Sequence, residues 1–364
     1  MSRGKGAITV TMIFKAPALN RDEKAGGNIL TIKKLRRGDG KVYPYISRVA
    51  MRHYLFSTLQ YPPYNWKPAA VEARGSGDRK VVQFDLTNDD IITSEELDAF
   101  GYMYTIEKKD NENGKGITRK APVGMTRAEA IEPWEGDTAF YANHDMAKRA
   151  KVDPNPYNKE EFTGFFKFSL TIDLEKLGYD EWNGSVLKGG IVTLQDLQSR
   201  NHGSRGSFQI IDDRIVFKVS TDEKIKRVKD ILSVLRNGII YHSSGINSPI
   251  IPEFLIAGFV TVPIPVFDPF VKATVADHCF CIDGEVLSKA FENDYLEFFA
   301  VVDNRSSDFV ERVCNERPID CPESTSSQDD SEKSKYIPSW DDFMNELEQK
   351  IRSAENNAQT DQES

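Results

Sequence analysis

Six of the cationic side chains between residues 33 and 52 lie in two groups, among glycine-containing stretches. They are Lys33, Lys34, Arg36, Arg37, Arg48 and Arg52. Phosphate contact requires several cations on a surface that a nucleic-acid backbone can approach, and neighbouring glycines permit that approach. Tyr43 and Tyr45 add flat rings on which a base or a ribose can stack. The segment predicts phosphate binding, with an exposed basic turn carrying structural tyrosines as an alternative of equal weight.

A second group of cations lies in the polar stretch 137–164, which we expect to be irregular because Pro154 and Pro156 interrupt it. Its cations and aromatic residues are His144, Lys148, Arg149, Lys151, Phe140, Tyr141 and Tyr157. Such a stretch suits an arm that reaches another molecule and orders there. A decorative surface loop is an equally good interpretation of its composition.

The residues that could support metal or nuclease chemistry are poorly spaced for either. The candidate metal ligands are His278, Cys279, Cys281, Cys314 and Cys321. Structural zinc normally uses paired Cys-x₂₋₄-Cys knuckles, so we expect free or buried thiols and no metal.

For a nuclease the candidates are Asp22 with Glu23 in the first loop, and His53. Asp22 and Glu23 are more simply explained as a loop salt-bridge cluster with Arg21 and Lys24, and His53 as a core histidine. The chain has no phosphate-binding loop, dinucleotide fingerprint or nucleophile elbow, so no cofactor is expected.

Charge is distributed unevenly along the chain, whose net charge is −9. Residues 1–80 carry 16 Lys and Arg against 5 Asp and Glu, whereas residues 316–364 carry 5 against 13. A polyanion responds to the local field within about 10 Å, so a basic N-terminal region on an acidic protein is compatible with nucleic-acid binding. An uneven but purely solvated surface explains the same charges.

The elements that must position these residues follow from hydrophobic periodicity. Alternation predicts strands at 7–14, 81–86, 166–174, 215–219, 255–262 and 295–302. Helical spacing predicts helices at 46–59, after Ser94, and at 220–238, where Ser220 and Glu223 form a capping box. The order strand, helix, interruption, strand, helix, strand indicates an α+β fold with a ferredoxin-like sheet that carries large insertions.

The segment 316–364 is rich in polar and acidic residues and predicts a largely disordered tail. One island has helical spacing, at Trp340, Phe343, Met344, Leu347 and Ile351. A solvated, partly helical tail is the favoured interpretation, with docking on a partner or on the main body as alternatives. Since no stretch approaches about 20 apolar residues, we expect a soluble, cytoplasmic protein without a membrane partner.

Several segments resemble the Cas-seven backbone subunits of type I CRISPR complexes, in particular the DevR branch associated with type I-B. The N-terminal ones are 18–21 (ALNR), 28–34 (NILTIKK) and 43–52 (YPYISRVAMR). Those that follow, in the family's order, are 119–125 (RKAPVGM), 136–138 (GDT), the strand at 165–174 and 264–270 (IPVFDPF).

The resemblance implies one hand-like domain, 1–315, followed by the acidic tail 316–364. A palm with an RNA-recognition-motif-like sheet would occupy about 1–62 and 165–315, fingers about 63–120, and a thumb about 134–164. Several copies would line a guide RNA as a helical homo-oligomer with other Cascade subunits. The thumb of each copy would turn a base outward, and the guide would pair with a target DNA strand.

The resemblance also implies roles for individual residues. Tyr45 and Ser47 would shape the turn into the first helix, and Met125 and Arg127 would lie at the thumb base. The other implied RNA contacts are Asn20, Arg21, Lys33, Lys34, Arg36, Arg48, Arg52, His144, Lys148 and Arg149.

We therefore expect a non-catalytic guide-RNA-binding subunit. Two enzymatic alternatives stay open: a type III-like subunit that cuts target RNA with Asp22, and a guide-processing endoribonuclease that uses His53.

Overall fold

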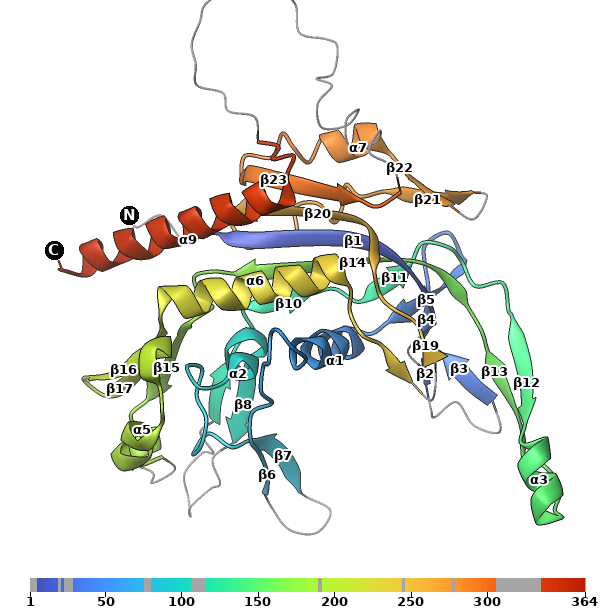
Figure 1. Ribbon diagram of the computed structural model, residues 1–364, viewed down its shortest axis with the longest axis horizontal. Helices are drawn as coiled ribbons and strands as arrows, with labels where there is room; N and C mark the ends of the chain where they lie inside the picture. The colour runs from blue at the N-terminus through green and yellow to red at the C-terminus, as the bar shows by residue number, and fades with distance from the viewer. Residues whose placement is uncertain are drawn as a thin grey trace, which may run out of the picture.

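A sheet of eight strands runs through the middle of the molecule, in a mixed α and β architecture (Figure 1). The computed structural model describes residues 5–18, 21–22, 29–74, 80–105, 116–188, 192–243, 246–276, 279–305 and 335–363. In spatial order the strands are β23 (Leu296–Asp303), β20 (Pro252–Val260), β1 (Ala7–Pro17), β14 (Thr163–Asp173), β11 (Ala128–Ala130), β5 (Val42–Ile46) and β4 (Lys34–Arg36), and β10 (Val123–Met125) also pairs with β14.

The centre of the sheet is the antiparallel pair β1–β14, in which Val10 lies opposite Leu170. The predicted alternation is confirmed for one face, where Val10 and Leu170 are buried beneath helices. The other face is buried too, so Thr11 is fully covered and its hydroxyl lies 2.8 Å from that of Ser169. Both strands are therefore covered on two sides, as interior strands of a layered domain are.

Each neighbouring pair in the series β20, β1, β14 and β10 is antiparallel. β10 and β11 have three residues each, too few for a periodic pattern, and the sequence did not predict them. They complete the sheet beside β14, and β23 extends it beyond β20. The predicted strand, helix, interruption, strand, helix, strand order is present, with β10 and β11 as additional strands before β14.

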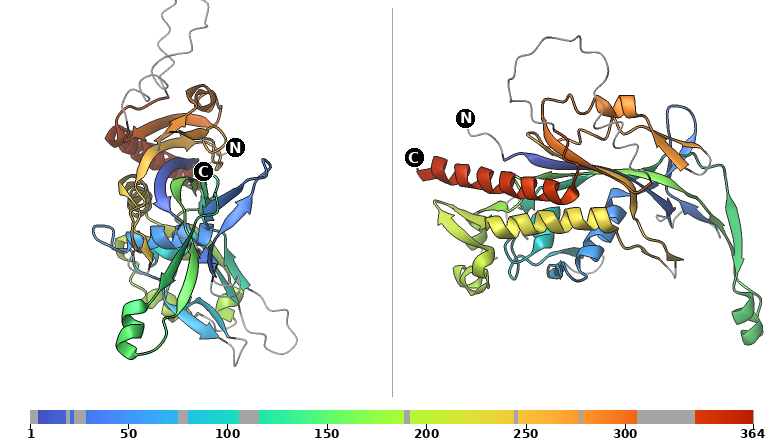
Figure 2. Two further views of the ribbon diagram at one scale, coloured as in Figure 1. Left: turned by 90° about the vertical axis from the view of Figure 1, so that its right-hand side faces the viewer. Right: turned by 45° about the horizontal axis from the view of Figure 1, so that its top comes forward.

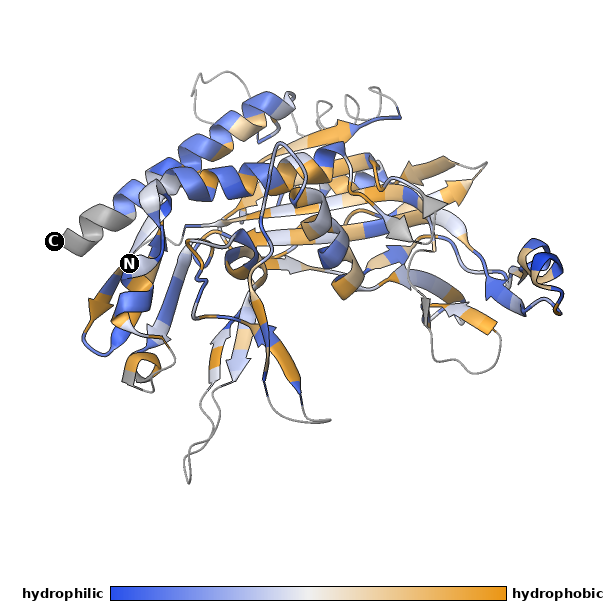
Figure 3. Ribbon diagram, turned by 60° about the horizontal axis from the view of Figure 1, so that its bottom comes forward, coloured by the Kyte–Doolittle hydropathy of each residue, from blue (hydrophilic) through white to orange (hydrophobic). Residues whose placement is uncertain are grey.

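Three helices cover one face of the sheet: α1 (Arg48–Leu59), α6 (Thr221–Asn237) and α9 (Trp340–Glu363), and Figure 2 shows α6 and α9 side by side. In Figure 3 the visible surfaces of α6 and α9 are largely hydrophilic, as expected for amphipathic helices packed on a core. Ser220 caps α6 by accepting a hydrogen bond from the Glu223 backbone N–H. The Glu223 carboxylate is held by Arg205 and Arg227, so ion pairs replace the second half of the predicted capping box.

The expectation of a solvated tail is wrong for α9, which packs on the main body. Trp340, Phe343, Leu347 and Ile351 are all buried in the same core as β1 and α6. The helical spacing was recognised in the sequence, but its buried partner surface was not. Charged contacts flank the apolar stripe, including Lys224 to Glu355 at 2.6 Å, with 3% and 5% of these side chains exposed.

Replacing Phe343 by alanine is expected to lower the free energy of unfolding by about 3–5 kcal/mol, because its ring is fully buried and a cavity would remain. Urea unfolding measures the change. Glu346, which is exposed on the same helix, provides the control, since Glu346→Ala should change stability by less than about 0.5 kcal/mol. Equal effects of the two substitutions would contradict the docking of α9.

A second core lies on the opposite face of the sheet. The chain after β20 supplies β21 (Ala273–Ala276), β22 (Cys279–Ile282) and α7 (Gly284–Ser288), at the top of Figure 1. Phe280 and Ile282 point into this core, whereas Cys279 and Cys281 are exposed on the other face of β22. A further small hairpin pairs β18 (His242–Ser243) with β19 (Ile246–Asn247).

A lower lobe has its own core and is built from two segments that are distant in sequence. The first contains β6 (Val71–Arg74), β7 (Val81–Phe84), α2 (Glu95–Phe100), β8 (Tyr102–Thr105) and β9 (Gly116–Arg119). The second contains β15 (Tyr179–Asn183), α4 (Ser185–Lys188), α5 (Leu194–Ser199), the 3₁₀ turn η2 (Gly203–Arg205), β16 (Gly206–Ile211) and β17 (Arg214–Val219). Residues 179–219 were expected in the main body, but they share the core of this lobe instead. Small two- and three-stranded sheets need a partner to bury one face, and here the sheets of the two segments cover each other.

An arm projects from the far end of the sheet (Figure 1). It consists of β12 (Thr138–Ala142), α3 (His144–Ala150) and β13 (Pro156–Glu160), and at its base β13 pairs with β3 (Ile29–Ile32), which pairs with β2 (Arg21–Asp22). The expectation of an irregular stretch is wrong here. Pro156 is the first residue of its strand, a position where proline is tolerated.

Candidate nucleic-acid interface

The predicted basic segment folds as a hairpin that leads directly into α1. Arg37 and Lys41 close the turn between β4 and β5 through the Arg37 N–H to Lys41 carbonyl hydrogen bond of 3.0 Å. β5 ends at Ile46, and the Ser47 hydroxyl then caps α1 by accepting from the Ala50 N–H at 3.2 Å. The hairpin, the cap and the first turn of α1 therefore bring the cations of residues 33–48 to one end of the sheet.

Three cations of this segment are exposed and available: Arg36, Lys41 and Arg48. The Arg36 guanidinium donates to the Gly40 carbonyl at 2.7 Å, and among the described residues none of the three forms an ion pair. Lys33 is half-buried between β3 and β4. Lys41 was not among the predicted contacts, although its place in the same basic run was a usable signal.

The Lys34 side chain contacts residues at the base of the arm instead of extending into solvent. Its ammonium lies 2.5 Å from a carboxylate oxygen of Glu160 and 3.8 Å from the centre of the Trp134 ring. The same Glu160 carboxylate accepts the Ile32 N–H at 2.9 Å. Lys34 thus fastens the edge strand of the sheet to the base of the arm, a contact between residues 126 positions apart.

Arg52 faces the lower lobe. It lies 3.3 Å from Glu96 and stacks 5.0 Å above the Phe100 ring of α2. Burial lowers the pKa of Arg52, and the neighbouring Glu96 carboxylate opposes part of that shift. Arg48 and Arg52 therefore differ in their surroundings, although both were predicted to contact RNA. Arg48 is exposed, whereas Arg52 joins two parts of the fold.

A compact cluster of charged and aromatic side chains surrounds Tyr45. Arg127 lies 5.4 Å above the Tyr45 ring and 2.6 Å from Glu129, which also binds Arg37 at 2.9 Å. Met125 belongs to β10, where it is half-buried against the first core. Arg37 lay in the predicted phosphate-binding segment, although the resemblance gave it no role of its own, and Glu129 was not predicted as a site residue.

The cations at the tip of the arm are separated from the others by the length of β12 and β13 (Figure 1). His144, Lys148 and Arg149 are exposed on α3, and Arg149 pairs with Asp145 at 2.8 Å. The exposed cations of the predicted set therefore fall into two groups, one at the sheet end and one at the tip.

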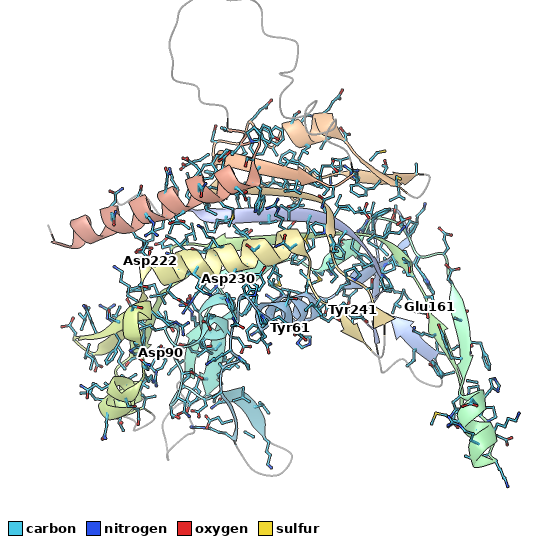
Figure 4. All side chains as sticks on the ribbon, in the orientation of Figure 1. Tyr61, Asp90, Glu161, Asp222, Asp230 and Tyr241 are labelled. Atoms are coloured by element: carbon cyan, nitrogen blue, oxygen red, sulfur yellow. The ribbon has the colours of Figure 1, made fainter. Side chains whose placement is uncertain are left out.

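Aromatic side chains line the arm between these two groups. Tyr141 and Tyr157 stack with ring centres 5.3 Å apart, and Phe140 is 65% exposed. Glu161, labelled in Figure 4, lies where the arm joins the body and accepts the Tyr141 hydroxyl at 3.0 Å. The arm thus exposes both cations and flat rings.

The residues considered for catalysis lie on different elements where the structure describes them, and Glu23 lies outside the described residues. Asp22 and Arg21 belong to β2, but their side chains, like the whole of Asn20, lie outside the described residues. His53 is exposed on α1 with its ring 5.7 Å from that of Tyr54, so the expectation of a core histidine is wrong. Its flank of the helix faces away from the sheet.

In the described part of the chain no three His, Cys, Asp or Glu side chains are grouped as a metal site would require. Cys314, Cys321 and His278 lie outside that part. Among the described helices, none combines the length and apolar character that crossing a bilayer requires.

Comparison with known proteins places these features in a wider context. A family model described as "CRISPR-associated negative auto-regulator DevR/Csa2" matches residues 8–278. The "CRISPR-associated protein Cas7/Cst2/DevR" of Myxococcus xanthus (strain DK1622) is 25% identical over 233 residues, which cover 58% of this chain and 70% of the relative.

Two solved structures are similar in part. One is a chain of a "CRISPR RNA-guided surveillance complex", with a TM-score of 0.46, 12% identity, and coverage of 83% of this chain and 91% of that one. The other is a chain of a "CRISPR RNA-guided surveillance complex, pre-nicking", with a TM-score of 0.45, 10% identity, and coverage of 96% and 100%.

Proposed function

Since this chain belongs to the CRISPR-associated DevR/Csa2 family, a Cas7-type group of Cascade subunits, we propose that it binds guide RNA and forms the backbone of a surveillance complex. The observation that carries the proposal is the exposed cation set at the sheet end, Arg36, Lys41 and Arg48, beside a protruding arm. Cations on one surface attract the RNA backbone without reading its sequence. Specificity would then come from pairing between guide and target DNA.

The sheet topology supports a palm of ferredoxin-like or RNA-recognition-motif-like type. The spatial order β20, β1, β14, β10 corresponds to strands four, one, three and two of that fold, and α1 and α6 cover one face. The lower lobe would be the fingers, enlarged by residues 179–219, and the arm would be the thumb. In this assignment the arm extends the surface on which RNA lies.

The arm also supports assembly of several copies along one RNA. The exposed cations at its tip lie far from the basic sheet end of the same chain, so one copy can offer two separate contact surfaces. Contacts between unlike surfaces generate open helical assemblies when the rotation does not close. We propose such a helical homo-oligomer, with other Cascade subunits at its ends.

Co-purification tests the proposal. The chain, expressed together with a repeat–spacer array, should retain short RNA of defined length, detected by its absorbance ratio and by sequencing. RNA-free protein from cells with an expressed array would contradict it. Expression without the array is the control for non-specific RNA.

The proposal assigns no catalytic step to the chain. The alternative, target-RNA cleavage with Asp22, is distinguished by incubating the RNA-loaded protein with matched target RNA and Mg²⁺. Cleavage at regular spacing that is lost in Asp22→Ala would replace the non-catalytic proposal.

A further inference from the structure

Two arginines from distant parts of the chain converge on one carboxylate beside the β4–β5 hairpin. Arg127 Nε lies 2.6 Å from Glu129 Oε1, and Arg37 Nη2 lies 2.9 Å from Glu129 Oε2. Arg37 also donates to the Ala130 carbonyl at 3.0 Å. Each carboxylate oxygen therefore has its own arginine.

Both guanidinium groups are held by tyrosines of β5. Arg37 lies 3.9 Å above the Tyr43 ring, and Arg127 lies 5.4 Å above the Tyr45 ring. The two tyrosines are two positions apart and share one face of the strand, and Glu129 of β11 is directly opposite Tyr45. Stacking on a ring leaves the in-plane N–H groups of a guanidinium available to an anion.

The cluster is accessible to solvent, with 33%, 48% and 30% of the Arg37, Arg127 and Glu129 side chains exposed. Burial would raise the pKa of Glu129, but hydrogen bonds from Arg127 and Arg37 outweigh it and lower that pKa. The carboxylate is therefore charged at neutral pH. The planar fork of arginine suits carboxylate and phosphate alike, so an RNA phosphate could take the same N–H groups.

Resting on the proposed function, we infer that Arg37 and Arg127 form a phosphate-binding pair for guide RNA and that Glu129 occupies this pair in the RNA-free subunit. An incoming phosphate must displace the carboxylate. Glu129 thereby lowers the affinity for RNA and sets how readily the subunit loads.

Glu129→Gln tests the inference, because the amide keeps the size of the side chain and removes its charge. Binding to a fluorescent single-stranded RNA, measured by anisotropy at several salt concentrations, should become about threefold to tenfold tighter with a steeper salt dependence. Glu135→Gln is the matched control, since Glu135 is exposed in the nearby segment between β11 and β12. It removes the same charge and should change affinity less than about twofold.

Two further variants identify the cause. Arg37→Ala in the Glu129→Gln background should remove the gain in affinity. Glu129→Asp, which keeps the charge, should bind like the unmodified chain, and a gain equal to that of Glu129→Gln would overturn the inference. Unchanged or weaker RNA binding by folded Glu129→Gln would overturn it as well. In both cases normal binding by the unmodified chain leaves the proposed function intact, whereas no RNA binding by that chain would contradict both.

Discussion

The double variant Arg36→Glu/Arg48→Glu is expected to lose guide RNA while remaining folded. Both side chains are exposed and form no ion pair within the described residues, so their reversal breaks no ion pair and costs the fold the exposed hydrogen bond from Arg36 to the Gly40 carbonyl. Each lost phosphate contact weakens binding and each new carboxylate repels the backbone. The combined loss of affinity at physiological salt should be on the order of 10²-fold.

This pair of positions is a cleaner choice than Lys34 with Arg52. Reversal of Lys34 would place two carboxylates together at Glu160, and reversal of Arg52 would do the same at Glu96. Loss of RNA in that variant could reflect a displaced arm or lower lobe rather than a lost phosphate contact. Reversing Lys34 and Arg52 therefore tests the fold as much as the interface.

The matched control is Lys218→Glu/Lys289→Glu, which makes the same change in net charge on β17 and after α7, away from the hairpin. Anisotropy with guide RNA and thermal melting should be measured on both double variants. Normal RNA affinity of Arg36→Glu/Arg48→Glu, or an equal loss in the control, would contradict the placement of the interface.

Removal of Asp98 is expected to cause a large loss of stability. Its side chain is fully buried, and its two oxygens lie 2.6 Å from Arg119 Nη2 and 2.7 Å from Arg227 Nη1. It also accepts the Gly178 N–H at 2.8 Å. Asp98→Ala would remove the carboxylate that two buried guanidinium groups share, leaving Arg227 with Glu223 at 3.0 Å and Arg119 with Asp180 at 3.6 Å, which should lower the free energy of unfolding by about 3–5 kcal/mol.

The exposed pair Asp222–Arg352 provides a control for Asp98. Its atoms are 2.8 Å apart, but 81% of the Asp222 side chain is exposed, so Asp222→Ala should cost less than about 1 kcal/mol in urea unfolding. An effect of Asp98→Ala as small as that would show that the buried cluster does not join the lobes.

The same cluster explains the role of Arg119, which in the sequence was part of 119–125, one of the segments that resemble the family. Arg119 also donates to the Lys176 carbonyl, and Arg227 donates to the carbonyls of Ile91 and Ile92. The two segments of the lower lobe and α6 therefore meet at Asp98. In the same lobe, Asp90, labelled in Figure 4, binds Arg200 at 2.7 Å.

Local patterns in the sequence predicted the long central elements well. β1, β14 and α6 each carry their own periodic signal, and all three are present close to the expected positions. β10 and β11 were not predicted, because three-residue strands are defined by their pairing with β14 and not by a periodic pattern. The docking of α9 was not predicted, because the sequence of an amphipathic helix does not show which surface the helix covers.

The candidate site was predictable as a set of residues but not as an arrangement. A basic run with tyrosines indicated phosphate binding, and the resemblance implied that Ser47 shapes the turn into the first helix, where it caps α1. The sequence could not show which cations form ion pairs within the fold and which stay exposed. The ion pairs depend on Glu160, Glu129 and Glu96, which are 126, 92 and 44 positions from Lys34, Arg37 and Arg52. Such long-range pairs are set by the tertiary fold.

Native mass spectrometry of the chain with RNAs of increasing length tests the central proposal most directly. A backbone subunit should load as successive copies, so the number of bound chains should rise in regular steps with RNA length. One copy bound at every length, or no bound RNA, would contradict the account.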